Sequence, residues 1–233
     1  MTGAASDIGA AIAERLERDG WQVARNELEG IQTRGYTATA DIGDPHAIAE
    51  LVAQVERDLG PITLLVNNAA HVRLGRIEDV TEDEFWRVID VNLSGAFFLA
   101  QACAPSMQRH RFGRIINMSS EWGQIGWPEA TAYCASKAGL ISLTKALARA
   151  LGPFGITANA IAPSVVDTRG LAIDAEHAGT TLEALHAEYV RRIPLGRLAA
   201  PEEIAALVGL LASDAAGSTT GQVLCPNGGS TIA

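Results

Sequence analysis

Short apolar segments alternate along this chain with longer segments whose apolar residues recur at helical spacing. The segment ITLLVN at 62–67 is a continuous apolar run, which is typical of a strand buried on both faces. Strands are predicted at 21–26, 36–40, 62–67, 114–118, 156–162 and 222–225, and helices at 6–18, 45–59, 81–109, 131–151 and 201–212. Because strands and helices alternate, we expect an α/β fold, a doubly wound parallel sheet with helices on both faces.

Length and composition limit the chain to few classes. Its 233 residues suit one domain, 1–233, and 48% hydrophobic residues suffice for one core. A net charge of −9 argues against a nucleic-acid partner and also weakens the case for an acidic protein partner. The N-terminus lacks the pattern of a signal peptide and no run predicts a membrane span, so no membrane is expected. Cys103, Cys134 and Cys225 have no metal-binding or disulfide spacing, which favours reduced thiols and a cytoplasmic location.

Several short motifs carry polar residues at the predicted strand ends and helix faces. TGAASDIG at 2–9 places Gly3 and Gly9 around a helix start, as in a pyrophosphate-binding turn or an ordinary glycine turn. In YCASK, Tyr133 and Lys137 lie four residues apart on one helix face, a spacing also common on solvated helices. Asn92 lies inside a long helix, where an asparagine that only packs is common. Each motif alone is a weak signal.

The conjunction of these motifs is highly specific. Their order along the chain is TGAASDIG, Asp41-Ile42, NNAA at 67–70, Asn92, Ser120, Tyr133 with Lys137, and PSVVDT at 163–168. This pattern resembles the short-chain dehydrogenase/reductase family over nearly the whole chain. The resemblance implies a Rossmann-like fold and an NAD(P)-dependent oxidoreductase that transfers a hydride between nicotinamide and a secondary alcohol or ketone.

The resemblance also implies catalytic roles, which the chemistry supports. Tyr133 is the expected acid/base, and a free tyrosine, with a pKa of about 10, is too weak an acid to be phenolate near neutral pH. The ammonium of Lys137, one helical turn away, is expected to lower that pKa and to hold the nicotinamide ribose. Ser120 is expected to hydrogen-bond the substrate oxygen, and Asn92 to hold a water that links Lys137 to solvent.

The cofactor residues follow in the same way. Asn68 is expected to support the strand beside the cofactor, Asp41 and Ile42 to meet the adenine, and Val166 and Thr168 to fix the carboxamide. The full cofactor set is Gly3, Ser6, Asp7, Ile8, Gly9, Glu27, Asp41, Ile42, Asn68, Ala69, Tyr133, Lys137, Pro163, Val166 and Thr168.

Glu27 falls at the end of the second strand of the family, where a carboxylate bonds the ribose 2′-hydroxyl and repels a 2′-phosphate. NAD is therefore the preferred cofactor. NADP is the alternative if a shortening of the strand moves Arg25 to its end.

The chain departs from the family pattern at five points. Asp7 replaces the middle glycine of the turn, Ala70 ends NNAA, Ser164 follows Pro163, and NGG stands at 227–229. The first strand of the family should precede Thr2 and is apparently absent from the chain. Its loss would leave unpaired backbone groups on both neighbouring strands. Truncation, an error in the assigned start and a genuine minimal variant all remain open.

Two alternative functions are kept beside the leading one. The first is a family member that binds nucleotide but is catalytically impaired, because Asp7 and the missing strand erode the cofactor site. The second is a 3-oxoacyl-(acyl-carrier-protein) reductase. Phe154, near where that subfamily tends to carry an arginine, and the acidic net charge count against it.

The substrate pocket should form beside Ser120 and Asn68. Substrate candidates are Glu121, Trp122, Gln124 and Trp127, with His71 and Arg73 nearby. The segment 169–195, irregular or loosely helical by its pattern, is expected to be a mobile lid. Apolar positions on the helices 81–109 and 131–151 predict a homotetramer, since the family usually pairs these helices.

Overall fold

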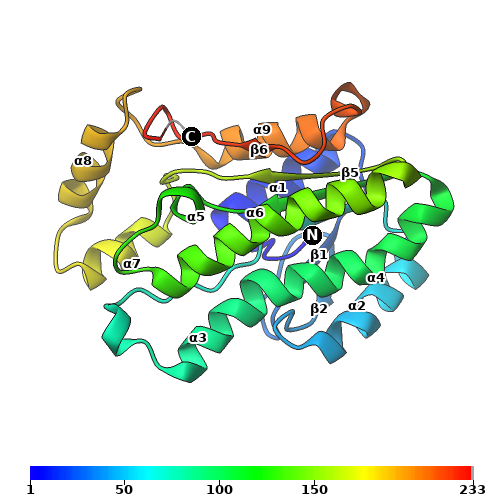
Figure 1. The fold of residues 1–233 in the computed structure, drawn as a ribbon, viewed down its shortest axis with the longest axis horizontal. Coiled ribbons are helices and arrows are strands. Elements are labelled where there is room, and N and C mark those ends of the chain that lie inside the picture. The colour runs from blue at the N-terminus through cyan, green and yellow to red at the C-terminus, as the bar shows by residue number, and fades with distance from the viewer. Residues whose placement is uncertain (232–233) are drawn as a thin grey trace.

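A computed structural model describes residues 1–231, without the side chain of His177 (Figure 1). The strands are β1 (Ala24–Glu27), β2 (Tyr36–Thr39), β3 (Leu64–Asn67), β4 (Gly113–Met118), β5 (Ile156–Ile161) and β6 (Val223–Leu224). The helices are α1 (Asp7–Arg18), α2 (Pro45–Leu59), α3 (Glu82–Ile89), α4 (Gly95–His110), α5 (Trp122–Ile125), α6 (Thr131–Leu151), α7 (Gly170–His177), α8 (Leu182–Arg192) and α9 (Pro201–Ala212).

All the strand pairs are parallel, as the alternating pattern predicts. The pairs form a two-stranded sheet, β1-β2, and a four-stranded sheet in the order β3-β4-β5-β6. Successive residues of a strand face opposite sides, so Leu65 and Ile115 join the core under α2, α4 and α6, whereas Val66 and Ile116 join the core under α1 and α9. Helices therefore cover both faces, and the doubly wound α/β fold is confirmed.

Residues 1–3 bridge the two sheets. Thr2 pairs in parallel with Asn26 of β1, and its amide also donates to the Val66 carbonyl of β3 (3.1 Å). The amide of Gly3 donates to the Asn26 carbonyl, and the amide of Asn26 donates to the Met1 carbonyl. The place of the expected first strand is thus held by a stub of three residues in the middle of the sheet.

A cavity of about 450 Å³ continues the line of this stub between β1 and β3. Its walls include Leu16 of α1, Val52 of α2, and Leu99 and Cys103 of α4, together with the segments that enter β1 and β3. The Met1 amino group stands at its end, donating to the Ala24 carbonyl (2.7 Å), and burial lowers the pKa of this group from 8.0 to about 6. Helices from both faces of the sheet line the space that a central strand would fill.

Two of the longer connections differ from one another. Residues 28–35 between β1 and β2 form turns without a helix, because so short a connection leaves little room for one. The segment 169–195 instead contains two regular helices, α7 and α8, so the expectation of an irregular or loosely helical segment is wrong. Thr181 caps α8 by accepting from the Ala184 amide, and Leu171, Ile193 and Leu198 form a small core of their own. Figure 1 shows both helices standing together at one end of the sheet.

Helices α3 and α4 are joined through a π-helix, Asp90–Ser94, into one continuous rod. The rod begins at a capping box, in which the Thr81 hydroxyl accepts from the Glu84 amide and the Glu84 carboxylate accepts from the Thr81 amide. By length and composition alone, Glu82–His110 is apolar enough to cross a membrane, but Leu99 and Met107 are fully buried in the core of the domain.

We predict that an extension of about five apolar β-branched residues before Met1 fills the cavity between β1 and β3. Burying even two such side chains should raise the melting temperature by roughly 5 °C or more. The extension also replaces the buried ammonium. The folded chain binds fewer protons than the unfolded chain between pH 6 and 8, so its stability rises with pH across this window. The extended chain should lose that rise.

The measurement is thermal unfolding at pH 6 and pH 8, and the matched control is a Gly-Ser extension of equal length. Equal melting temperatures for the two extended chains would show that the cavity does not accept a strand.

Candidate active site

The edge of the parallel sheet where the strands reach their carboxyl ends carries most of the predicted residues. Asn68 follows β3, Ser119 and Ser120 follow β4, and Pro163 lies two residues after β5. Because parallel strands all end at the same edge, these residues lie on one side of the sheet, where the Ser119 hydroxyl also reaches the Lys137 carbonyl of α6 (2.9 Å).

Tyr133 and Lys137 project from one face of α6, as their spacing predicts. The Lys137 side chain is 2% exposed, its Nζ donates to the Met118 carbonyl at the end of β4 (2.6 Å), and it lies 5.4 Å from the centre of the Tyr133 ring. Burial lowers the pKa of Lys137 to about 8. The lysine is therefore fixed between the strand end and the phenol ring.

The pKa of Tyr133 moves in the opposite direction from the sequence-based expectation. Burial raises the pKa of the phenol to about 12, and a hydrogen bond with Ser120 opposes this only in part. The Ser120 hydroxyl also accepts from the Trp122 amide (3.2 Å). In this structure desolvation outweighs the hydrogen bond with Ser120, and the phenol holds its proton at neutral pH.

Asn92 lies in the π-helix and is buried. Its amide oxygen accepts from the His71 backbone amide (2.7 Å), and its Nδ2 donates to the His71 carbonyl (2.9 Å) and to the Ser136 hydroxyl (3.0 Å). The wider turn of a π-helix is frequent at functional sites. Asn92 therefore joins the loop after β3 to α6, one residue from Lys137.

The glycine turn before α1 packs closely against the loop after β3. Gly3 has φ +65°, and a Cβ there would meet the Ala69 Cα at 2.8 Å; a Cβ on Gly9 would overlap the Gly3 carbonyl. The Asn68 Nδ2 donates to the Gly3 carbonyl (2.9 Å) and so braces the glycine turn. Ser6 caps α1 by accepting from the Gly9 amide (3.0 Å). The glycines are thus required by the close backbone approach before α1.

Glu27 is the last residue of β1, where the count from the sequence places it. Its carboxylate accepts from the Ala5 amide of the glycine turn. Arg25 points elsewhere: it is 3% exposed and donates to the Glu17 carboxylate of α1 (2.7 Å). Of the two residues weighed for the cofactor ribose, only Glu27 lies against the turn.

Asp41 and Ile42 follow β2. The Asp41 carboxylate accepts from the Gly43 amide (2.8 Å) and from Arg87 of α3 (2.8 Å), while Ile42 is buried. Burial alone would raise the pKa of Asp41, but the bonds from Arg87 and Gly43 outweigh it and hold the pKa below its ordinary value. The carboxylate is therefore ionised and fixed at this end of β2.

The loop after β5 is tied to the catalytic serine loop and to α9. The Pro163 carbonyl accepts from the Glu121 amide (2.9 Å), and Val166 pairs with Ala199 before α9. The Thr168 carbonyl accepts from the Leu171 amide at the start of α7. Ser164 takes part as well, since its hydroxyl donates to the Glu121 carboxylate (2.6 Å).

Two tryptophans form a flat wall beside Tyr133. Trp122 and Trp127 stack at 5.0 Å with an interplanar angle of 7°, and Trp122 meets the Tyr133 ring edge-on at 6.1 Å. Arg192 of α8 lies over the Trp127 ring at 5.4 Å, so the segment 169–195 contacts this wall.

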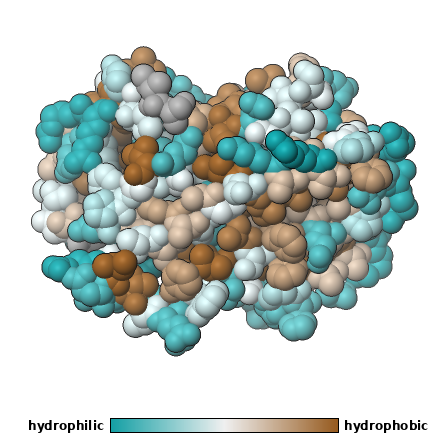
Figure 2. Space-filling model, in the orientation of Figure 1, coloured by the Kyte–Doolittle hydropathy of each residue, from teal (hydrophilic) through white to brown (hydrophobic). Residues whose placement is uncertain are grey.

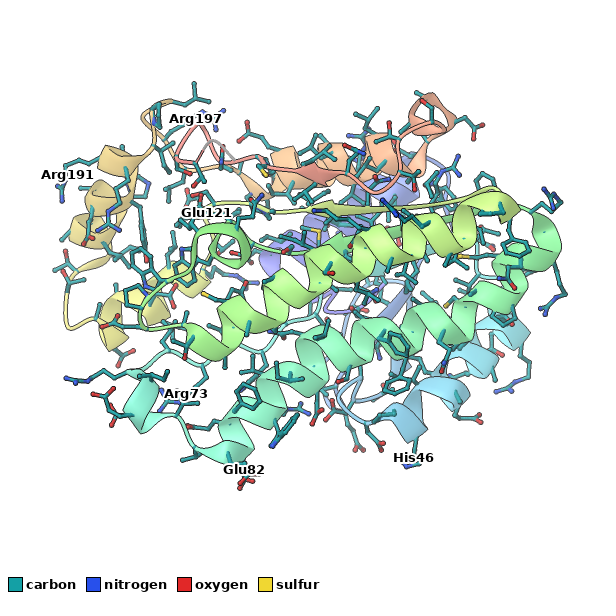
Figure 3. The ribbon with its side chains drawn as sticks, in the orientation of Figure 1. His46, Arg73, Glu82, Glu121, Arg191 and Arg197 are labelled. Atoms are coloured by element: carbon teal, nitrogen blue, oxygen red, sulfur yellow. The ribbon has the colours of Figure 1, made fainter. Side chains whose placement is uncertain are left out.

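The polar substrate candidates already have partners within the chain. The Glu121 carboxylate is buried and accepts from Ser164 and from Ser230 and Thr231 near the C-terminus, next to which Figure 3 places it. Gln124 accepts weakly from the Cys225 thiol (3.2 Å). His71 is held through its backbone by Asn92, and Arg73 pairs with Glu84 (2.5 Å).

Sequence reasoning missed several residues that hold the site together. The Thr2 hydroxyl accepts from the amides of Asn68 (3.1 Å) and Ala69 (3.0 Å), a role that its place beside Gly3 could have signalled. The Ser119 hydroxyl donates to the Lys137 carbonyl (2.9 Å), and the Ser136 hydroxyl accepts a hydrogen bond from the Asn92 Nδ2. Arg169 binds Asp7, and no local pattern links these two residues, which lie 162 positions apart.

A parallel sheet with a glycine turn before α1 and a serine, tyrosine and lysine at its carboxyl edge defines a nucleotide-dependent oxidoreductase. A family model described as Enoyl-(Acyl carrier protein) reductase matches residues 3–231. The chain belongs to the short-chain dehydrogenase/reductase family and is an NAD(P)-dependent enzyme of that family.

Individual relatives bear different names. The chain is 38% identical to an acetoacetyl-CoA reductase of Rhizobium meliloti (strain 1021) over 242 residues, which cover 100% of this chain and 98% of the relative. It is 35% identical to a 3-oxoacyl-(acyl-carrier-protein) reductase of Haemophilus influenzae over 240 residues, 98% of this chain and 96% of the relative. The ligand-free structure of Thermoplasma acidophilum aldohexose dehydrogenase matches with a TM-score of 0.94 at 32% identity, covering 100% of this chain and 92% of that one.

We predict that Asn92→Ala lowers the free energy of unfolding by about 1–3 kcal/mol, because the His71 amide and the His71 carbonyl both lose their hydrogen bonds to the Asn92 side chain. Urea unfolding measures the loss, and Gln101→Ala, at an exposed position of the adjoining α4, is the matched control. A loss no larger than that of the control would contradict the bracing role of Asn92.

Proposed function

We propose that this enzyme interconverts a secondary alcohol and its ketone with NAD as the preferred cofactor and Tyr133 as the acid/base. The observation that carries the proposal is the arrangement of Ser120, Tyr133 and Lys137 at the end of β4, beside the stacked tryptophans. The glycine turn also fits a dinucleotide, since Gly3 and Gly9 leave no room for side chains next to the start of α1. The complete set of Ser120, Tyr133 and Lys137 counts against a catalytically impaired protein.

The chain's own residues supply the polar part of the reaction. When bound, the nicotinamide supplies the hydride to the ketone or accepts it from the alcohol. The Ser120 hydroxyl donates a hydrogen bond to the reacting oxygen, and the Tyr133 phenol gives that oxygen its proton. A pKa of about 12 keeps the phenol protonated at neutral pH, which suits the reductive direction.

Lys137 and Asn92 assist proton transfer by the Tyr133 phenol. The Lys137 Nζ, anchored on the Met118 carbonyl, places a cation near the ring and favours phenolate as the proton leaves. Lys137 also holds the ribose hydroxyls. Asn92 positions a water that links Lys137 to solvent, so that the proton lost from Tyr133 is replaced. Asp41 and Ile42 meet the adenine, and Val166 and Thr168 hold the carboxamide.

The stacked tryptophans limit what the substrate can be. Trp122 and Trp127 offer a flat apolar face beside the phenol, which suits a planar or ring-shaped substrate. Gln124 is the candidate for a substrate hydroxyl, and Glu121 would have to release Ser230 or Ser164 to act in the same way. Arg192, on the Trp127 ring, closes this wall from α8, and 169–195 acts as the lid.

Reduction of a 3-oxoacyl thioester is the second candidate, and sequence similarity favours it. The relatives named for acetoacetyl-CoA and for 3-oxoacyl-(acyl-carrier-protein) cover nearly the whole chain. Phe154 stands exposed where a basic residue would aid an acidic carrier, and the net charge of −9 repels one. A panel of sugars, cyclic and linear secondary alcohols, ketones and acetoacetyl thioesters, scored by nicotinamide absorbance, separates the two candidates.

We predict that Tyr133→Phe abolishes turnover on every active substrate of the panel while NADH binding stays nearly unchanged, because only proton transfer is lost. Nicotinamide absorbance gives the rate and fluorescence titration gives the affinity. Lys137→Ala should lower the rate and weaken NADH binding, since the Lys137 side chain holds the ribose and lies beside the phenol. Activity of Tyr133→Phe within about tenfold of the unmutated rate, or ~1.4 kcal/mol of barrier, would remove the acid/base role.

We predict tighter binding of NADH than of NADPH, because Glu27 stands at the end of β1 and Arg25 is turned away to Glu17. Glu27→Arg should level or reverse the preference, whereas Glu27→Gln tests the charge without adding a cation. Dissociation constants from fluorescence titration measure this preference for each variant. Tighter binding of NADPH by the unmutated chain would contradict the assignment of Glu27.

A homotetramer in a reducing cytoplasm completes the proposal. Leu140 and Leu151 of α6 are buried in the chain's own core. In contrast, Trp86 on α3 and Phe97 on α4 are 51% and 42% exposed. Apolar residues run across the middle of the face that carries α4 and α6 (Figure 2). Cys103, Cys134 and Cys225 are free thiols. These features suit association through that face.

Light scattering at micromolar concentration should give about four times the chain mass of 24.5 kDa. Phe97→Asp should lower the measured mass, and Ile77→Asp, at a 70% exposed position outside the two helices, should not. A monomeric mass for the unmutated chain would contradict the tetramer.

A further inference from the structure

Asp7 is the first residue of α1 and occupies the turn position where the family carries a glycine. Its two carboxylate oxygens are bound by one residue: the Arg169 backbone amide donates to Oδ2 (2.7 Å) and the Arg169 Nε donates to Oδ1 (2.6 Å). The Arg169 side chain is 84% exposed and that of Asp7 is 22% exposed. An ion pair this exposed adds little to stability, so another role is needed to explain the double contact.

The position of Asp7 creates a charge conflict. The start of α1 offers amide groups and a positive helix end to an anion, and a dinucleotide places its pyrophosphate there. A bare carboxylate at the same place would repel that pyrophosphate. A guanidinium bound to the carboxylate cancels its charge, and the pair as a whole is neutral.

The geometry leaves the arginine able to do more than cancel charge. Only Nε and the backbone amide are used on Asp7, and within residues 1–231 neither Nη group of Arg169 donates to a partner. A guanidinium presents its N–H groups as a planar fork that suits phosphate oxygens. Arg169 also follows Thr168 directly and precedes α7, so the bond to Asp7 fastens the start of the 169–195 segment to the glycine turn.

We propose that Arg169 is a cofactor-phosphate-binding residue, which Asp7 holds at the head of α1 and which in turn makes an aspartate tolerable in this turn. The ligand class is a pyrophosphate diester, as in NAD. The proposal rests on the proposed function, because it assumes that the dinucleotide binds at the glycine turn. The proposal also implies that the Asp7–Arg169 ion pair holds the start of α7 against the glycine turn.

A double-mutant cycle in NADH affinity tests the proposal. Arg169→Ala should raise the dissociation constant at least about tenfold, the loss of one charge-assisted hydrogen bond, and it also exposes the Asp7 charge. Asp7→Gly should bind NADH as well as the unmutated chain or better. The double variant should bind more tightly than Arg169→Ala alone, because the uncompensated carboxylate is gone. Arg191→Ala, an exposed arginine on α8 that Figure 3 labels, is the matched control and should change nothing.

A second readout needs no cofactor. Digestion by a glutamate-specific protease at Glu176 and Glu183, in α7 and α8, should be faster in both Asp7→Gly and Arg169→Ala than in the unmutated chain and in Arg191→Ala. If the unmutated chain binds NADH but Arg169→Ala binds it equally well, or if the double variant binds no better than Arg169→Ala, the phosphate role is overturned. If the unmutated chain binds neither nucleotide, the proposed function fails instead. Digestion that is equally fast in Asp7→Gly, Arg169→Ala and the unmutated chain would show that the Asp7–Arg169 pair does not hold α7 in place.

Discussion

The hydrogen bonds that residues 1–3 make to β1 on one side and to β3 on the other join the two parts of the sheet. The same three residues place the Thr2 hydroxyl on the amides of Asn68 and Ala69, and they aim the glycine turn at the start of α1. The glycine turn and the loop after β3 are both held by this narrow connection. It carries the position of Glu27 as well, since that carboxylate reaches the Ala5 amide from β1.

The catalytic half of the site depends on buried amides instead. Asn67 of β3 donates to Asn117 of β4 (2.8 Å), which donates to the Thr144 hydroxyl of α6 (2.8 Å). Asn92 and Ser136 make a second link between the π-helix and α6. Hydrogen bonds between buried polar groups in a low-dielectric interior fix relative positions strongly, so α6 is held in register with the strand ends. These two links therefore set the positions of Tyr133 and Lys137 relative to the strand ends.

Much of the fold could be predicted from the sequence, because local chemistry decides it. Asp44 and Pro45 start α2 and Gly60 ends it, and α2, α6 and α9 have the predicted bounds. The parallel sheet followed from the alternation of strands and helices, and the family followed from the order of the motifs. The helices α7 and α8 were missed because neither has strong apolar periodicity, and Leu171 and Ile193 acquire their shared core only in three dimensions. The raised pKa of Tyr133 was missed for a similar reason, since spacing gives the distance to a lysine but not the extent of burial. The pairing of Asp7 with Arg169 joins residues 162 positions apart, which no local pattern encodes.

The buried carboxylate of Glu121, with its three hydroxyl partners, has a practical consequence for handling this enzyme. Through Ser230 and Thr231 it fastens the C-terminal segment to the loop that carries the catalytic serine, while residues 1–3 build the opposite side of the same site. Removal of Ser230 and Thr231 would leave the Glu121 carboxylate buried with Ser164 as its remaining hydroxyl partner, and it would loosen the loop that carries Ser120.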